Sequence, residues 1–194
     1  VGYNDALTNM GCTNYSNGRL PTGCVATATA QIIKYWSKPN VSYNFNVMDA
    51  NNGRNAETQK LMKNIGTNSI INMQYNCTES GAYSSSVPKF LRDIFYYSSG
   101  GNYQDYNYTS VVADIKVNKV VYLAGAASKR RAGIFPFRYT TYSDGHAWVC
   151  DGYTIEGPRC ALARYLEMKW GFDFTDPLRN LNGSYMEDNW QPAI

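Results

Sequence analysis

Cys24 is the residue of this sequence best placed for nucleophilic chemistry. It stands near the start of segment 22–36, which is expected to form one helix because Val25, Ala28 and Ile32 recur at helical spacing. The unpaired N–H groups of a first helical turn carry about half a positive charge, so they stabilise a thiolate and lower the cysteine pKa. They can also hold an oxyanion on a carbonyl under attack. The alternative is that Cys24 is a small buried apolar side chain.

Neighbouring residues are expected to set the ends of this helix. Thr22 is a candidate N-cap, and Pro39 is expected to mark the stop because proline cannot continue a helix. Tyr35 and Trp36 extend the apolar stripe, so we expect both side chains to be buried. Gly23 leaves space for a substrate backbone beside the candidate nucleophile.

His146 is the only histidine in the sequence, so it is the only imidazole available as a base for the thiol. The dipeptides Asp144-Gly145 and Asp151-Gly152 favour turns on either side of a short apolar strand that begins at His146. A histidine at the mouth of a strand, beside a small glycine, is well placed to reach across a cleft. The alternative is a structural histidine with a satisfied hydrogen bond. Asp144 is a minor candidate for orienting the ring.

Several segments resemble the streptopain family of secreted bacterial cysteine peptidases with a papain-like fold. The nucleophile helix of that family is similar to the run TGCVATATAQI that begins at Thr22. Its histidine strand resembles the segment that begins Gly145-His146, and its small-residue loop before a helix resembles residues 81–88. Its Trp-Gly turn resembles Trp170-Gly171. These landmarks occur in family order, and the wide separation of Cys24 from His146 is close to the roughly 130 to 150 residues of papain-like enzymes.

The resemblance implies an α+β, papain-like fold in one catalytic domain, residues 1–194. A helical half, about residues 1–110, would carry Cys24, and an antiparallel sheet half, about 111–194, would carry His146, with the active-site groove between them. Trp170 would cover the imidazole and hold its orientation, with ordinary core packing as the alternative. The residues expected to line the substrate groove are Gly23, Ser84, Ser85 and Gly145.

The implied activity is that of a cysteine endopeptidase that works through a Cys–His dyad and an acyl-enzyme. Its partners would be protein or peptide substrates and a propeptide or propeptide-like inhibitor, and it would need no metal or organic cofactor. The resemblance also implies a bacterial zymogen that acts as a virulence factor and is secreted, periplasmic or held at the cell surface. Its signal peptide and propeptide are expected to lie upstream of Val1.

Some positions depart from the family pattern. The family has a glutamine upstream of the nucleophile that completes the oxyanion hole, whereas the first glutamine here is Gln31. The counterpart is expected just upstream of Val1 or on another chain, and the alternative is that the protein lacks it. Lys169 replaces an asparagine before Trp170 and is expected to alter the imidazole pKa, and residues 172–174 replace glycines. These departures keep open a binding protein that has lost catalysis. An acyl transferase or amidase with the same dyad is the other alternative.

Composition limits the remaining possibilities. The chain has 194 residues, 44% of them hydrophobic, which is enough for a sizeable core, and its formal charge is only +3. The basic run 129–131 is interpreted as a solvated loop rather than a nucleic-acid site. No apolar run reaches the roughly 20 residues that cross a bilayer. Besides Cys24 there are four cysteines, which allow three full pairings, with Cys150 and Cys160 the most local pair and reduced thiols the alternative.

The elements that must position these residues follow from local patterns. Helices are expected over residues 56–65, from Pro88 through Phe95, and over 110–115, and Gly66 is expected to stop the first of them. Alternation in residues 41–48 favours a short strand or an extended arm. Further strands are expected over residues 117–124, 134–141, 146–150 and 161–168.

Overall fold

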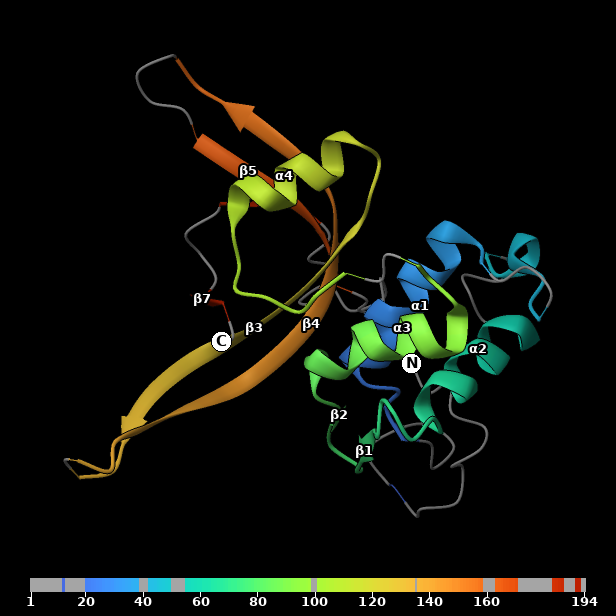
Figure 1. Ribbon diagram of the computed structural model, residues 1–194, viewed down its shortest axis with the longest axis horizontal. Helices are drawn as coiled ribbons and strands as arrows, with labels where there is room; N and C mark the ends of the chain where they lie inside the picture. Colours follow the sequence, from blue (N-terminus) through green and yellow to red (C-terminus); the bar gives the residue numbers. More distant parts are fainter. Residues whose placement is uncertain are drawn as a thin grey trace. The chain divides into compact units, whose positions relative to one another are not determined.

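A computed structural model describes residues 12, 20–38, 42–49, 55–98, 101–134, 136–158, 163–170, 183–186 and 191–192. The chain divides into two compact units, Val1–Tyr103 and Gln104–Ile194, and each is described by itself (Figure 1). The first unit is mainly helical and the second is built on an antiparallel sheet. The expected α+β class is therefore confirmed. That the two units form one catalytic domain stays a prediction.

The first unit contains three α-helices among its described residues. They are α1 (Cys24–Trp36), α2 (Ala56–Gly66) and α3 (Val87–Phe95), with the short elements η3 (Phe45–Val47), β1 (Gln74–Tyr75), β2 (Ser80–Gly81) and η5 (Ser84–Ser86) between them. Strands β1 and β2 pair antiparallel, with Tyr75 opposite Ser80. The expected helices 56–65 and from Pro88 are confirmed, although Gly66 is the last helical residue of α2 and Thr67 is its C-cap.

Helix α1 is buried along much of its length, as its sequence predicts. The buried side chains include Thr29. Its hydroxyl donates to the carbonyl of Val25 at 2.7 Å, so this buried polar group has a hydrogen-bond partner. Two expectations about its ends were wrong. Gly23 is the N-cap residue and no side chain caps the helix, so Thr22 does not have that role. Tyr35 and Trp36, in the last turn before the left-handed C-cap Ser37, are 50% and 39% exposed and are not buried as expected.

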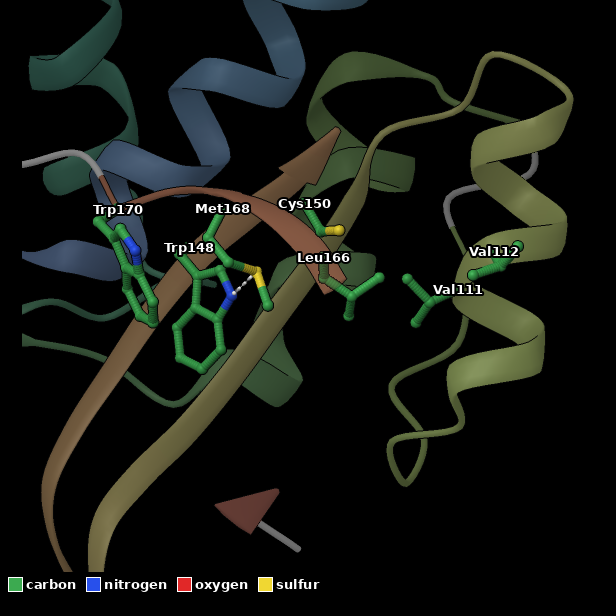
Figure 2. Close-up of a cluster of buried hydrophobic side chains, with 7 residues drawn as sticks. All are labelled: Val111, Val112, Trp148, Cys150, Leu166, Met168 and Trp170. Carbon is green, nitrogen blue, oxygen red and sulfur yellow. Dashed lines mark hydrogen bonds between the residues drawn. The ribbon is translucent and has the colours of Figure 1, made fainter. Parts of the chain in front are cut away.

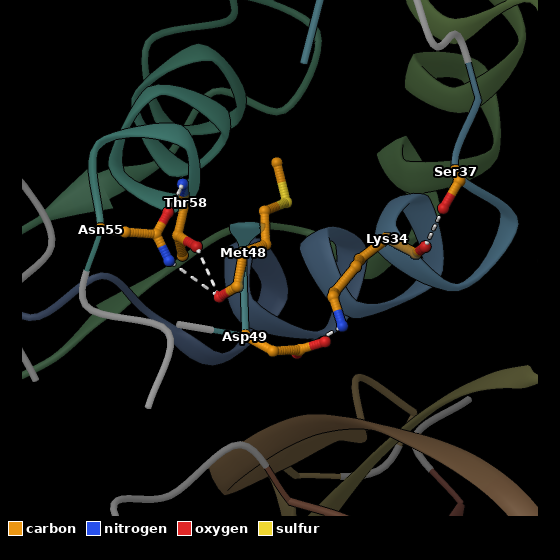
Figure 3. Close-up of polar contacts among 6 residues, drawn as sticks. All are labelled: Lys34, Ser37, Met48, Asp49, Asn55 and Thr58. Atoms are coloured by element: carbon orange, nitrogen blue, oxygen red, sulfur yellow. Dashed lines mark hydrogen bonds and ion pairs between the residues drawn. The ribbon is translucent and has the colours of Figure 1, made fainter. Parts of the chain in front are cut away.

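A polar network lies between the last turn of α1 and the first turn of α2 (Figure 3). Lys34 forms an ion pair with Asp49. Asn55 caps α2 by accepting from the N–H of Thr58 at 3.0 Å, and its amide donates to the carbonyl of Met48 at 2.9 Å. Segment 48–49 is therefore fixed from both helices, since one of its residues pairs with α1 and the other with α2.

The expected strand over residues 41–48 was wrong. Phe45–Val47 form a 3₁₀ turn, in which Phe45 is buried and Val47 is 40% exposed. A turn places Tyr43, Phe45 and Met48 in the core, which a strand with strict alternation would not do, because positions 45 and 48 would lie on opposite faces. The same apolar residues therefore serve the core in a different geometry.

One disulfide bond lies within the described residues. Cys12 and Cys77 are joined with an S–S distance of 2.08 Å, and Cys12 is 4% exposed. The local pair Cys150–Cys160 was wrong, because Cys150 is a thiol. It is fully buried on a strand, and its sulfur lies 3.5 Å from the carbonyl of Gly152. Burial raises the pKa of Cys150 to about 12, so this thiol stays protonated at neutral pH.

The second unit consists of α4 (Tyr108–Lys116) and a five-stranded antiparallel sheet. The strands are β3 (Val121–Ala132), β4 (Tyr139–Glu156), β5 (Ala163–Lys169), β6 (Gly183–Met186) and β7 (Gln191–Pro192), in the order β6-β5-β4-β3-β7. Helix α4 confirms the expected helix 110–115. The exposed basic run 129–131 lies in β3 and not in a loop.

Strand β4 is one continuous strand of 18 residues, where the sequence favoured two strands separated by turns. Asp144-Gly145 lies inside it, with Gly145 opposite Ala126. Asp151-Gly152 also lies inside it, at a shift in the pairing with β5 between Cys150 and Gly152. A bulge uses the same small residues as a turn, because both need local departures from regular strand geometry.

The core of the second unit lies between α4 and the sheet (Figure 2). Val111 and Val112 on α4 belong to one buried cluster with Leu166 on β5, which is 1% exposed, and Val111 lies beside Leu166. The other members of this cluster are Trp148, Cys150, Met168 and Trp170. These side chains come from alternate positions of two neighbouring strands, so one face of β4 and β5 supplies the core.

Of the helices that the structure describes, none combines the length and the apolar character that a membrane crossing requires.

Candidate active site

Cys24 is the first residue of α1. Its side chain is partly exposed and carries a thiol. The first turn of the helix contains no acidic residue, and no side chain caps its N–H groups. No carboxylate in that turn therefore opposes the effect of the helix dipole on the Cys24 sulfur. The dipole favours the thiolate over the thiol.

Gly23 places Cys24 at the helix start in a conformation that few other residues adopt. Its φ and ψ are 84° and 145°, and a Cβ built there would come within 2.5 Å of the Met73 methyl carbon and of the Ser80 carbonyl oxygen. The hydroxyl of Thr27 donates to the carbonyl of Gly23 at 3.0 Å, and the Thr27 N–H donates to it at 3.1 Å. The direction that a Gly23 side chain would take is therefore occupied by Met73 and Ser80, and a place for Gly23 in the substrate groove stays a prediction.

The loop before α3 carries the two serines expected in the substrate groove. Ser84 and Ser85 lie in the 3₁₀ turn η5, where Ser84 is partly buried and Ser85 is exposed. The turn is closed by Ser86, whose N–H and hydroxyl donate to the carbonyl of Tyr83 at 3.0 and 2.7 Å. The loop is thus an ordered turn, and the role of its serines in substrate binding stays a prediction.

His146 lies inside β4, opposite Gly125, and not at the mouth of a strand as the sequence suggested. Its Nε2 is 3.0 Å from the backbone carbonyl oxygen of Trp170. A carbonyl oxygen only accepts hydrogen bonds, so Nε2 must carry a proton and donate it. In the neutral ring the lone pair is then on Nδ1, which leaves that nitrogen as the basic atom.

Two indole rings lie against the imidazole. The ring centroids of His146 and Trp170 are 5.6 Å apart at an interplanar angle of 25°, and those of His146 and Trp148 are 6.0 Å apart at 15°. The Nε1–H of Trp148 donates to the sulfur of Met168 at 2.9 Å, which holds that indole in place (Figure 2). The sequence placed Trp170 beside His146, and the structure brings them together.

Burial lowers the pKa of His146 below its ordinary value of 6.5, and the hydrogen bond to Trp170 opposes part of that shift. Lys169 is not among the causes, contrary to the expectation from the sequence. Its ammonium lies 3.6 Å from a carboxylate oxygen of Asp151. At neutral pH, the favoured form of His146 is therefore the neutral imidazole with its proton on Nε2.

Sequence reasoning missed two parts of this arrangement. The hydrogen-bond partner of His146 is the carbonyl of Trp170 and not a side chain, and backbone acceptors leave no sign in residue type. Trp148 was also missed as a ring partner, although a signal was present. It stands two residues after His146, and residues at that spacing in a strand share a face.

Gly145 is exposed, and a Cβ built on it would meet only the Gly125 carbonyl oxygen, at an ordinary 3.9 Å. Crowding therefore does not explain a glycine here.

Cys24 belongs to the first unit and His146 to the second, so their pairing stays a prediction. Among the residues that the structure describes, no group of three His, Cys, Asp or Glu side chains could hold a metal ion.

Comparison with known proteins places the chain in a family. The model of the Peptidase C10 family matches residues 2–59 and 41–174. The chain is 27% identical over 171 residues to thiol protease/hemagglutinin PrtT of Porphyromonas gingivalis, covering 70% of this chain and 18% of that protein. It is 27% identical over 173 residues to streptopain of Streptococcus pyogenes serotype M1, covering 68% of this chain and 39% of the relative.

A streptopain of Streptococcus pyogenes serotype M28 is similar at 28% identity over 174 residues. The chain thus spans less than two-fifths of the length of these curated relatives. The family matches cover most of the chain, and the landmarks at Cys24 and His146 fall within them. The expected resemblance to the streptopain family is thereby confirmed, and the chain belongs to the Peptidase C10 family.

Proposed function

We propose that this chain is a cysteine endopeptidase in which Cys24 is the nucleophile and His146 the general base and acid. Membership of a peptidase family supports the reaction class. The observation that carries the assignment of the base is the hydrogen bond from Nε2 of the only histidine to the Trp170 carbonyl. It reserves Nδ1 for proton exchange with a thiol, which is what the reaction requires.

The proposed reaction moves one proton back and forth through Nδ1. Cys24 gives its proton to His146, and the thiolate attacks the carbonyl carbon of a peptide bond. The oxyanion is held by N–H groups of the first turn of α1, and by the upstream glutamine if the full protein has one. As the tetrahedral intermediate collapses, the leaving amine takes the proton from Nδ1. Water then attacks the thioester, His146 accepts its proton, and the acid is released.

The two indoles give Trp148 and Trp170 a role in this proposal. The two indoles contact each other, with ring centroids 4.6 Å apart, and both lie near the same imidazole. An imidazolium beside these aromatic faces is stabilised by the ring quadrupoles, typically by about 0.5 to 2 kcal/mol. That stabilisation opposes the burial that lowers the His146 pKa. The rings also fix the imidazole plane, so that Nδ1 keeps one direction. Trp170 is therefore proposed as a positioning residue, with Gly23, Ser84, Ser85 and Gly145 as parts of the substrate groove.

The substrates would be proteins or peptides, and a propeptide or propeptide-like inhibitor would bind the same groove. The disulfide Cys12–Cys77 supports an oxidising compartment, as for a bacterial protein that is secreted, periplasmic or held at the cell surface. These assignments follow the family and rest on the proposed dyad.

Alkylation kinetics test the nucleophile. Iodoacetamide should modify Cys24 at pH 6 to 7, and His146→Ala should slow the reaction roughly tenfold or more, because an ordinary thiol with a pKa near 8.5 is mostly protonated there. Cys150 is an internal control, since it is buried with a pKa of about 12. Peptide mapping identifies the modified residue. A Cys24 that reacts no faster than a small-molecule thiol would indicate an inactive binding protein.

The single histidine permits a direct test of the pairing. In NMR titrations of histidine-labelled protein, the His146 pKa should fall when Cys24 is replaced by serine, because a neighbouring thiolate raises the pKa of an imidazole and a hydroxyl does not. Cys150→Ser is the matched control and should leave the titration unchanged. An identical titration in wild type and Cys24→Ser would refute the dyad.

Product analysis with added amines separates hydrolysis from acyl transfer.

A further inference from the structure

The hairpin of β3 and β4 extends beyond the rest of its sheet (Figure 1). Among the residues that the structure describes, β5 pairs with β4 at residues 149–156 of β4, and β7 pairs with β3 at residues 125–126 of β3. From Ser128 opposite Ser143 to Ala132 opposite Tyr139, the two strands pair with each other and with no other described strand. The second unit therefore presents a two-stranded ribbon whose end, residues 128–143, we call the hairpin tip.

The end of the hairpin tip exposes large apolar side chains. Ile134 is 86% exposed, Phe137 83% and Tyr139 61%. Ile134 and Phe137 lie between the two strands, and Tyr139 begins β4. Gly133 has a φ of 90°, a Cβ built on it would meet the Phe137 carbonyl oxygen, and the Arg138 N–H donates to the Pro136 carbonyl at 3.0 Å. Three large apolar side chains exposed in one place favour a partner that offers an apolar environment.

Just behind this apolar end the hairpin tip is basic. Lys129, Arg130, Arg131 and Arg138 are exposed, and the sequence has no acidic residue from 121 to 143. Residues 129 and 131 lie on one face of the ribbon and residue 130 on the other, because successive strand residues alternate. Arg131 pairs with Thr140, directly behind the Ala132–Tyr139 pair, and Arg138 stands between Phe137 and Tyr139. Positive charge therefore lies within the apolar end of the ribbon and directly behind it.

We propose that the hairpin tip binds the surface of an anionic lipid bilayer. Ile134, Phe137 and Tyr139 would enter the boundary between headgroups and acyl chains, about 5 to 10 Å deep, while the arginines contact lipid phosphates. A nucleic acid or an acidic polysaccharide would satisfy the charges but would leave the apolar end in water, so the apolar end favours lipid. This inference goes beyond the proposed peptidase activity and does not depend on it.

Vesicle co-sedimentation of the full chain carrying Cys24→Ala tests the proposal. The chain should bind phosphatidylcholine vesicles with 30% phosphatidylglycerol more tightly than pure phosphatidylcholine vesicles, and 0.5 M salt should weaken binding. Replacing Arg130, Arg131 and Arg138 together by glutamine should reduce partitioning roughly a hundredfold, since each basic residue contributes about fivefold. Ile134→Ser with Phe137→Ser should reduce it by about tenfold or more.

Matched variants separate the hairpin tip from overall charge. Lys63→Gln with Lys89→Gln and Lys119→Gln makes the same change in net charge on exposed residues elsewhere, and Val117→Ser removes an apolar side chain that is 61% exposed. These should bind like the parent. The proposal fails if they weaken binding as much as the hairpin variants, or if neutral vesicles bind equally well. It also fails if the chain binds no vesicle. Finally, it fails if heparin or DNA displaces the chain from vesicles and also binds the double variant Ile134→Ser, Phe137→Ser, because the apolar end would then play no part.

Discussion

The backbone carbonyl of Trp170 accepts the hydrogen bond that orients His146, the base of the proposed dyad. Because the acceptor belongs to the backbone, a substitution of the side chain does not remove it. Replacing the indole removes ring contacts and core packing but leaves the acceptor in the chain. Residue type therefore matters for the stacking of Trp170, while the path of β5 determines the hydrogen bond. The tautomer of His146 depends on strand geometry, because β5 must bring residue 170 back to residue 146.

Gly23→Ala tests the start of α1 at the scale of one residue. A side chain at φ 84° and ψ 145° is strained by about 1 to 3 kcal/mol, and its Cβ would press on the Ser80 carbonyl, so the free energy of unfolding should fall by at least that range. Cys24 should also lose part of its reactivity with iodoacetamide. Gly81→Ala is the control, because no atom lies within 4 Å of its added Cβ. Urea unfolding of both variants measures the difference, and equal losses would contradict the packing argument.

The lowered pKa of His146 predicts how stability depends on pH. Between pH 6.5 and the lower folded-state pKa, the unfolded chain binds a proton at this residue that the folded chain does not. The free energy of unfolding should therefore decrease as pH falls through this window, and the full loss is reached below the folded-state pKa. Cys24→Ser is the background of choice, because it removes any thiolate that would raise the pKa.

Urea unfolding from pH 7.5 to 5 measures this effect. His146→Gln in the same background should show a shallower decrease, since the only histidine has been removed. Carboxylates titrate in both proteins and cancel in the comparison. Parallel curves would show that burial does not shift the His146 pKa.

Much of the site could be predicted from the sequence at this scale, for identifiable reasons. Cys24 and His146 are chemically distinctive, and one of them has no competitor of its type. The Thr22 cap was wrong because the choice between two adjacent residues depends on backbone angles, and Gly23 adopts the angle that only glycine tolerates well. The contact of Gly23 with Ser80 joins two distant segments, which local patterns do not specify.

At the scale of elements, the helices were predictable and the strand boundaries were not. Helix α2 begins with a capping asparagine and carries a clear apolar spacing, and both signals are local. The Asp-Gly pairs of β4 favour turns locally, but pairing along β3 supplies eleven partners and overrides that preference. The sequence around Phe45 was ambiguous between a strand and a 3₁₀ turn, because a short run of alternating apolar residues is compatible with both.

The core that joins α4 to the sheet gives a prediction for this scale. Leu166→Ala should lower the free energy of unfolding by about 2 to 5 kcal/mol, because Leu166 is 1% exposed and packs against Val111 and Val112. Ile155→Ala, at a residue that is 49% exposed, should cost less than about 1 kcal/mol. Amide exchange of α4 should rise in the first variant and stay unchanged in the second. A similar cost for both would mean that α4 is not held by this cluster.

At the scale of the whole molecule, the disulfide Cys12–Cys77 is a covalent long-range constraint within the first unit. It closes a loop with a sequence separation of 65 residues that contains α1 and α2. In the chain-entropy model such a loop stabilises the folded state by about 4 kcal/mol, because the crosslink restricts the unfolded chain. Both cysteines lie in the first unit, and the second unit contains no described part of that loop.

Replacing Cys12 and Cys77 together by alanine should therefore destabilise the first unit more than the second. Hydrogen–deuterium exchange of the full chain should show lost protection in α1 and α2, by up to about a thousandfold, while β4 and β5 keep theirs. Cys150→Ala is the matched control, since it removes a buried thiol from the second unit and should affect β4 and β5 instead. Equal loss of protection in both units after removal of the disulfide would show that they unfold as one cooperative domain. That result would make the stability of the nucleophile helix depend on the sheet that carries the histidine.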